Sequence, residues 1–166
     1  MKKWAALLTM LCMAATFCFA ADPAEGYWIS YDEKTGKATA GWKIWEEGGE
    51  LKGEITSLAD LPQDQLATAG TGKSYADFYH GTDIGTLSSV GTQWIWGLKK
   101  KSAGNWEKGS IIDPGSGDKY ACKVTFHAAD GKKYKVDTLE MRGSIGPFGR
   151  SQYWQKASET EARSLR

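Results

Sequence analysis

The residue types that most often act as nucleophiles, bases or metal ligands are scarce in this sequence. It has two histidines, His80 and His127, and three cysteines, of which Cys122 lies in a segment of alternating hydrophobicity. Cys122 and His127 are an odd number of positions apart, so on a strand their side chains face opposite sides and form no thiolate–imidazole pair. One such cysteine and two distant histidines are too few for a zinc site. We therefore expect no bound metal and no cofactor.

Acidic side chains give no clearer sign of catalysis. Asp113 and Asp118 flank a glycine-rich stretch, where a hairpin turn explains both residues and the spacing of a calcium loop is absent. Asp137 and Glu140 could be nominated as the carboxylate pair of a glycoside hydrolase, but nothing in their surroundings singles them out. The sequence contains no serine motif of the nucleophile-elbow type. We therefore predict that the protein is not an enzyme, and we assign no catalytic residue.

Tryptophan is the one residue type whose abundance points to binding. The sequence contains eight tryptophans, and Trp94-Ile95-Trp96 directs two indoles to one face of a strand. A barrel interior can be filled by such side chains or can enclose a small ligand, and both alternatives are open at this point. For the second alternative, we assign a ligand site to inward tryptophans and to aromatic residues of a long connection: Trp42, Tyr75, Phe78, Trp94 and Trp96.

The elements that must position these residues are short antiparallel strands. Residues 120–126 alternate between apolar and polar side chains, which indicates a strand with one buried face. Turn sequences at residues 32–36, 47–49 and 113–118 separate several such segments. The apolar set shifts by one position near residues 137–138, which predicts a β-bulge there. The pattern as a whole predicts an all-β domain, either a sandwich or a barrel.

One long connection interrupts the strand pattern over residues 59–81. It contains Pro62, lacks periodicity and is aromatic in its second half. Connections of this length within a compact domain are often functional. We weigh two interpretations of its aromatic part, residues 74–80. It forms a lid over a ligand site, or its aromatic side chains simply pack on the barrel.

Residues 1–20 have the pattern of a secretory signal peptide. The basic pair Lys2-Lys3 is followed by an uncharged apolar stretch, and Cys18-Phe19-Ala20 places small residues where signal peptidase cuts. We expect cleavage after Ala20, export to the periplasm or the medium, a β-barrel domain over residues 21–156 and a frayed polar tail over residues 157–166. An uncleaved membrane anchor is the alternative, because the uncharged stretch is close to the shortest length that spans a bilayer.

The charge distribution argues against two classes of partner. Without Lys2 and Lys3, the 21 basic residues fall to 19 against 20 acidic ones, which gives a net charge of −1. The one basic run, residues 99–101, is interpreted as a solvated loop, so nothing indicates a nucleic-acid-binding face or a polybasic membrane patch. We expect no membrane span after cleavage. Cys122 would then be the single remaining cysteine, without an intramolecular disulfide, and we expect a monomer.

Two regions of the sequence together resemble a known family. The first predicted strand opens with Gly26-Tyr27-Trp28, and a second group of residues extends from Trp106 to Trp154. Taken in order, these residues closely resemble the exported bacterial family named domain of unknown function 2147, over nearly the whole mature chain. The residues that we assign to this structural motif are Gly26, Trp28, Trp106, Asp113, Pro114, Gly117, Tyr120, Arg142, Gly143, Gly146, Arg150 and Trp154.

The resemblance implies a lipocalin-like, antiparallel up-and-down β-barrel with no established activity. The Gly-x-Trp opening also resembles that of lipocalins, which implies that Trp28 closes one end of the barrel under a late arginine. Arg142 or Arg150 could take that place through a cation–π contact. The long connection departs from the commoner family pattern, because Lys73–Phe78 stands where many members carry an Asn-Pro-Asp stretch.

On these grounds we weigh three functions. The leading hypothesis is a binding protein that holds a small apolar ligand between Trp94, Trp96 and the lid. The second is a non-catalytic structural or protein-interaction domain of the cell envelope, which an exposed apolar patch would favour. The third is an enzyme, which a deep pocket that gathers Asp113, Arg142 and a histidine would favour.

Overall fold

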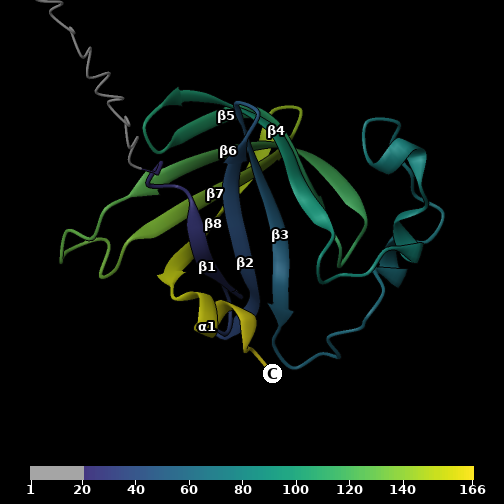
Figure 1. The fold of residues 1–166 in the computed structure, drawn as a ribbon, viewed down its shortest axis with the longest axis horizontal. Coiled ribbons are helices and arrows are strands. Elements are labelled where there is room, and N and C mark those ends of the chain that lie inside the picture. Colours follow the sequence, from purple (N-terminus) through teal and green to yellow (C-terminus); the bar gives the residue numbers. More distant parts are fainter. Residues whose placement is uncertain (1–20) are drawn as a thin grey trace, which may run out of the picture.

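The computed structural model describes residues 21–166, and the predicted signal peptide lies outside the described residues. Its strands form a closed antiparallel barrel in which each strand pairs with the next and β8 pairs with β1 (Figure 1). The predicted all-β, up-and-down barrel is therefore confirmed. The strands are β1 (Gly26–Tyr31), β2 (Ala38–Glu47), β3 (Glu50–Leu58), β4 (Gln93–Ser102), β5 (Asn105–Asp113), β6 (Asp118–His127), β7 (Thr138–Ile145) and β8 (Phe148–Ala157).

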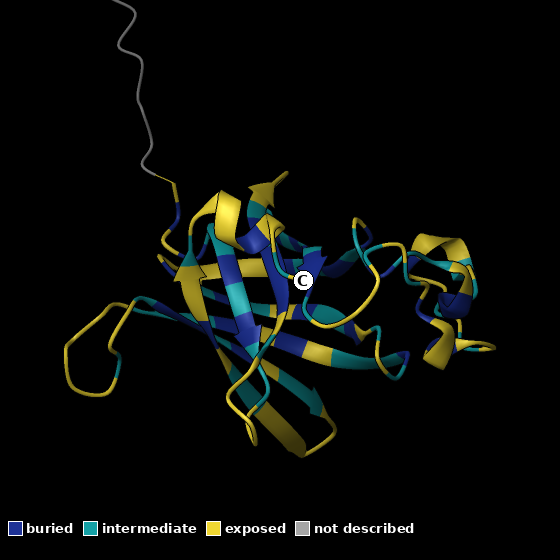
Figure 2. Ribbon diagram, turned by 90° about the horizontal axis from the view of Figure 1, so that it is seen from below, coloured by how far each residue is buried: buried dark blue, intermediate teal, exposed yellow. Residues whose placement is uncertain are grey.

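The barrel wall follows the hydrophobic alternation of the sequence, and buried and exposed positions succeed each other along the strands (Figure 2). On β6, Cys122 and Val124 are buried inside, whereas Ala121 and Lys123 are exposed outside. The Cys122 sulfur lies 3.2 Å from that of Met141. Burial raises the pKa of the Cys122 thiol well above its ordinary range. This cysteine is therefore a small apolar residue of the core and not a reactive thiol.

The bulge predicted at residues 137–138 is wrong. β7 begins at Thr138 and pairs with β6 in unbroken register along its length. Residues 128–137 form a loop ahead of the strand, so Tyr134 and Leu139 do not belong to one strand. The shift in the apolar pattern therefore marks where the strand begins.

The C-terminal tail was expected to fray, and this expectation is wrong as well. It forms a helix, α1 (Glu159–Arg163), whose first turn Ser158 closes in a reciprocal capping box. Ala162 is fully buried against the barrel, and its carbonyl accepts a hydrogen bond of 2.8 Å from the Ser57 hydroxyl. A Cβ atom at Gly41 of β2 would lie 1.8 Å from that carbonyl oxygen, so only glycine allows α1 to approach this closely.

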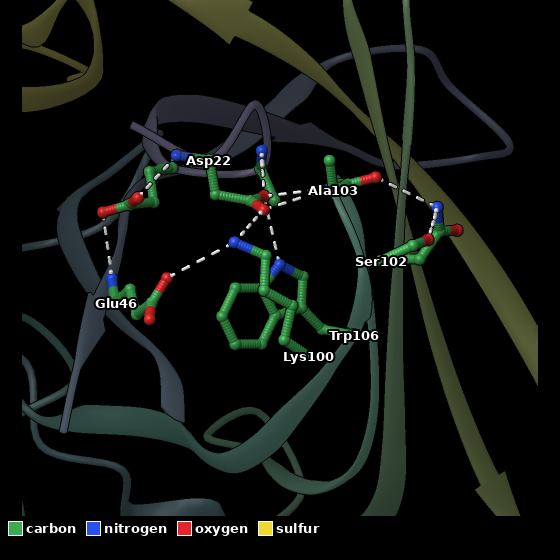
Figure 3. A network of polar contacts seen from close by, with 10 residues as sticks. Asp22, Glu46, Lys100, Ser102, Ala103 and Trp106 are labelled. Carbon is green, nitrogen blue, oxygen red and sulfur yellow. Dashed lines mark hydrogen bonds and ion pairs between the residues drawn. The ribbon is translucent and has the colours of Figure 1, made fainter. Parts of the chain in front are cut away.

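One end of the barrel, which we call the closed end, is plugged by Trp28, Trp106 and the N-terminal segment 22–25. Asp22 organises this plug (Figure 3). Its buried carboxylate accepts hydrogen bonds from Trp106 Nε1 (3.1 Å), and from the backbone N–H groups of Ala24 (3.0 Å) and Gly104 (3.1 Å). The Lys100 ammonium lies 3.0 Å from its second oxygen. No local sequence pattern marks Asp22 for this role.

The pKa of Asp22 reports the balance of forces at this plug. Burial by itself raises the pKa of the carboxyl group. The hydrogen bonds from Ala24, Trp106 and Gly104 and the nearby Lys100 ammonium act in the opposite direction, and together they hold the pKa below its ordinary value. The carboxylate is therefore the stable form of Asp22 in the folded barrel.

Trp28 closes the same end, but through a different cation from the one predicted. Lys156 Nζ lies 4.4 Å from the centroid of the Trp28 indole and donates a 2.7 Å hydrogen bond to the Glu25 carbonyl. The β1–β8 register places Trp28 directly opposite Lys156. Arg142 is exposed on the outer face and Arg150 lies at the other end of β8. Neither predicted arginine covers Trp28, because the strand register brings a lysine there instead.

The connection between β3 and β4 is longer than predicted and covers residues 59–92. It projects from one side of the barrel (Figure 1). There the Lys73 ammonium bonds to Asp118 (2.7 Å), and the Tyr75 hydroxyl donates to the Gly117 carbonyl (3.0 Å). These contacts anchor the connection to the β5–β6 turn. Its regular structure consists of three short 3-10 helices: η1 (Thr68–Gly70), η2 (Tyr79–Gly81) and η3 (Ile84–Thr86).

Candidate functional site

The end of the barrel opposite the plug, which we call the open end, contains a cavity of about 440 Å³. This volume lies in the range of sites for small molecules. Every strand except β4 contributes to the wall, and Leu61 is the residue of the long connection that reaches it. The apolar lining consists of Ala40, Trp42, Ile55, Leu58, Leu61, Ile111, Ile112, Pro114, Met141 and Trp154.

Two stacked indoles, Trp42 and Trp154, lie in the wall of the cavity. The rings of Trp42 and Trp154 lie 4.5 Å apart, centroid to centroid, at an interplanar angle of 22°. Trp42 Nε1 donates to the Ser30 hydroxyl (3.1 Å), and Trp154 Nε1 donates to the Gln152 side chain (3.1 Å). Both indole N–H groups are thus satisfied within the protein, and the two nearly buried rings form an apolar part of the cavity wall.

The mouth of the cavity carries its charged groups. Arg150 is the one cation among the lining residues, and Asp113 is the one anion. The Asp113 carboxylate accepts a 2.8 Å hydrogen bond from the backbone N–H of Gly115, so it is turned toward its own turn. Arg150 Nε and Nη2 both donate to one oxygen of Glu33, at 2.9 and 2.6 Å. Glu33 belongs to the β1–β2 loop, so this ion pair joins that loop to the neighbouring strand β8 at the rim of the mouth.

The Arg150–Glu33 ion pair also bridges the weakest seam of the barrel. The β1–β8 ladder contains three residue pairs and ends at Ile29↔Gln155. By comparison, the β7–β8 ladder continues to Ile145↔Phe148 at the open end. Between β1 and β8, the ion pair takes the place of backbone pairing on the open-end side of this ladder.

Sequence reasoning found the lining only in part. Trp42 was assigned to a ligand site and does line the cavity. Met141, Ile112 and Gln152 were missed. The sequence does contain a pattern that identifies part of the lining, because Arg150, Gln152 and Trp154 alternate along β8 and therefore share one face. A face that carries a charged and an amide side chain is usually interpreted as pointing to solvent, so the pattern favours the wrong side. Six residues assigned to the structural motif line the cavity: Asp113, Pro114, Tyr120, Gly143, Arg150 and Trp154.

The other four predicted ligand residues gather in a separate cluster, and none of them lines the cavity. Phe78 is buried; it stacks on Trp94 with a centroid distance of 5.7 Å and contacts Trp96 in a tilted arrangement at 4.8 Å. Lys119 Nζ lies 5.7 Å from the ring centroid of Tyr75 and 5.6 Å from that of Trp96. The prediction that Trp94 and Trp96 line the interior cavity is therefore wrong.

The strand alternation explains why this aromatic cluster lies outside the barrel. Tyr120 lines the cavity, so its neighbour Lys119 must lie on the outer face of β6. On β4, Ile95 and Leu98 are fully buried inside the barrel, whereas Trp94 is fully buried on the outer face beneath Phe78. Gly97 has a φ of 72° and interrupts the alternation, so that Trp96 and Leu98 face opposite sides. Residues 74–80 thus pack on the outer wall, as the second interpretation of the connection had it. They do not form a lid over the cavity.

The arrangement expected of an enzyme is not found at the cavity. Its lining contains neither a histidine nor Arg142. On the outer face of β7 and β8, the Ser151 hydroxyl donates to Glu140 (2.7 Å), and His127 Nε2 lies 2.9 Å from the other Glu140 oxygen. Ser151 and His127 thus contact the same carboxylate, one oxygen each, and this group lies outside the cavity.

Two further observations concern residues 21–166 only. They contain no group of three or more His, Cys, Asp or Glu residues arranged to hold a metal ion. In the same part of the chain, no helix has both the length and the apolar character needed to cross a membrane.

Comparison with known proteins agrees with the barrel geometry. The sequence model of a family described as "Uncharacterized protein conserved in bacteria (DUF2147)" matches residues 26–156. Among solved structures, the chain is similar to protein HP1028 from Helicobacter pylori, which is described as belonging to the lipocalin family. The TM-score is 0.63 at 16% sequence identity, and the match covers 83% of this chain and 85% of that one. No curated protein matches the chain.

Proposed function

Because the chain belongs to the DUF2147 family of bacterial proteins and folds as a lipocalin-like barrel, we propose that it binds a small, mainly apolar ligand inside the open end. The observation that carries this proposal is the cavity of about 440 Å³ between the Trp42–Trp154 stack and the mouth. A barrel built only for stability would fill this volume with its own side chains, because unfilled volume costs stability.

Filling the cavity from its wall should weaken binding while leaving the fold intact. Gly143 of β7 lines the cavity, and a Cβ atom there would meet only Tyr120, at an ordinary contact distance of 3.4 Å. We expect Gly143→Leu to weaken binding of the neutral fluorescent probe N-phenyl-1-naphthylamine by about tenfold or more, because the leucine occupies ligand space. Fluorescence titration of the purified protein measures this affinity.

The matched control is Ala121→Leu on β6, which pairs with the residue after Gly143 but points out of the barrel. It adds a similar apolar side chain in the same part of the sheet and should leave probe affinity unchanged. The thermal unfolding midpoints of both variants confirm that each one folds. If Gly143→Leu folds and binds the probe as tightly as the wild type, the probe does not bind in the cavity, and the proposal fails.

We also propose that the protein is exported and acts as a monomer in the periplasm or the medium. The support is the signal-like pattern of residues 1–20. Mass spectrometry of the protein from a periplasmic fraction tests both statements. A mature chain that begins at Ala21 and has the mass of a monomer is expected. A chain that retains residues 1–20 in the membrane fraction would contradict the proposal.

One observation favours the second candidate function, an interaction domain. Ile145 and Phe148 flank the β7–β8 turn at the open end and are 58% and 81% exposed. Two large apolar side chains at one turn form a small patch of the kind that partners cover. Sedimentation velocity of the wild type and of Phe148→Ser distinguishes the cases, because only an apolar self-contact would make the sedimentation coefficient depend on this residue.

A further inference from the structure

We propose that the ligand of this cavity is an amphiphile with a carboxylate head, and that Arg150 receives the head by exchanging it for Glu33. This inference rests on the proposed function, because it names the chemistry of a ligand in the same cavity. It is carried by the position of the one cation in the lining, the geometry of its ion pair and the hydrogen-bond donors around it.

The charge balance of the cavity favours an anionic head. Arg150 is the one cation that lines it. The one anion, Asp113, is occupied by the backbone N–H of Gly115 in its own turn. A ligand that enters apolar end first, toward the Trp42–Trp154 stack, leaves its head group at the mouth beside the guanidinium. A cationic head would meet this guanidinium and be repelled, and a neutral head would not compete for it.

The neutral polar groups of the lining also suit an anion. Tyr120, which carries a hydroxyl, and Gln152 both line the cavity. The Gln152 oxygen already accepts the Trp154 indole N–H, so its amide NH₂ is the part left to donate. These two side chains and Arg150 thus present donors to the cavity, and a carboxylate carries only acceptors.

The ion pair that now holds Arg150 is replaceable. Both of its hydrogen bonds end on one Glu33 oxygen, whereas an arginine and a carboxylate match best when two N–H groups meet two oxygens. The side chains are 67% and 38% exposed, so the pair is in contact with solvent. A ligand carboxylate that approaches from inside the cavity can therefore take over the guanidinium with better geometry.

The exchange has a structural consequence at the barrel seam. On the open-end side of Ile29↔Gln155, the β1–β8 seam is bridged by Glu33 and Arg150. When the ligand takes Arg150, the β1–β2 loop that carries Glu33 loses this tie to β8. Binding of a carboxylate head group therefore breaks the Arg150–Glu33 ion pair and releases the β1–β2 loop from β8.

The test compares two ligands that differ only in the head group, dodecanoate and dodecan-1-ol, as competitors of N-phenyl-1-naphthylamine at low ionic strength. For the wild type, dodecanoate should displace the probe at about tenfold lower concentration than the alcohol, because its head gains charge-assisted hydrogen bonds. Arg150→Gln should remove this preference, so that the acid and the alcohol displace the probe at similar concentrations. Glu33→Gln should strengthen dodecanoate binding, because it frees Arg150 without altering the cavity.

The matched control is Arg142→Gln, which removes an exposed arginine from the outer face of β7 and should leave the preference intact. Equal displacement by acid and alcohol in the wild type, or a preference that survives Arg150→Gln, would overturn this inference while the proposed cavity still stands. Failure of Gly143→Leu to affect probe binding would instead refute the cavity itself. The two failures are therefore distinguishable in one set of titrations.

Discussion

Asp22→Ala should lower the free energy of unfolding by about 3–5 kcal/mol, since it removes a buried anion together with the hydrogen bonds that it accepts. The Trp106 indole N–H and the backbone N–H groups of Ala24 and Gly104 would lose their acceptor inside the plug. Denaturant unfolding followed by tryptophan fluorescence measures this change. The slope of the transition should stay close to that of the wild type, because the surface exposed on unfolding is nearly the same.

The stability difference between the wild type and Asp22→Asn should depend on pH in a definite direction. The folded pKa of Asp22 is lower than its ordinary value of 3.8, so its charge stabilises the fold above that pH. This contribution is lost as the pH falls through the folded pKa. The stability difference between the wild type and Asp22→Asn should therefore be full at pH 7 and shrink below 3.8. A difference that stays constant down to strongly acidic pH would show that the carboxylate charge does not support the plug.

Glu47→Gln is the matched control for the plug. The Glu47 carboxylate also forms an ion pair with a lysine, since Lys52 Nζ lies 2.6 Å from it, but the Glu47 side chain is 66% exposed. This variant should unfold at the same denaturant concentration as the wild type, because exposed ion pairs are screened by solvent. An effect of Asp22→Ala no larger than that of Glu47→Gln would contradict the role that we assign to Asp22.

Trp154→Ala should cost about 3–5 kcal/mol of unfolding free energy, because it removes a large, fully buried side chain and leaves an empty volume beside Trp42. It should also weaken N-phenyl-1-naphthylamine binding, since the Trp42 ring loses the neighbour that fixes it at 4.5 Å. Trp154→Phe keeps an aromatic ring in this position and should cost clearly less on both measures.

Trp45→Ala provides the comparison for this substitution. Trp45 lies on β2 beyond Trp42, is only partly buried and has Lys43 Nζ 5.3 Å from its ring centroid. The same change of residue type outside the cavity should leave probe binding unaffected and cost far less stability. If Trp45→Ala and Trp154→Ala were equally harmful to binding, the probe would not be held by the Trp42–Trp154 stack.

The barrel itself could be predicted from local patterns, because period-two alternation and turn sequences act over a few residues. The alternation of residues 120–126 became β6, and the glycine-rich stretch 113–118 became the β5–β6 turn. Local patterns failed where a contact between distant segments decides the structure. The tail became α1 because it docks on Gly41, more than one hundred residues away in the chain, and no tail sequence reveals such a surface.

The site was harder to predict than the fold because inward and outward positions depend on strand register. The tryptophans of β4 share a face, as predicted, but Ile95 and Leu98 occupy the interior, so that face is the outer one. Likewise, the cation over Trp28 is Lys156 because the β1–β8 register places it there. The prediction that Arg150 could cover Trp28 places it at the wrong end of the barrel. Its distance from the closed end becomes known only from the pairing of β8 with β1.

The measurement that tests the central claim most directly is a ¹H–¹⁵N correlation spectrum of the tryptophan indole N–H groups during titration with N-phenyl-1-naphthylamine. The described chain has indoles in four places: Trp42 and Trp154 at the cavity, Trp28 and Trp106 at the closed end, Trp94 and Trp96 on the outer wall, and Trp45 further along β2. We predict that the Trp42 and Trp154 signals shift saturably while those of Trp28, Trp106 and Trp94 stay in place. Shifts confined to Trp94 and Trp96 would contradict the account, since they would place the ligand on the outer wall and not in the barrel.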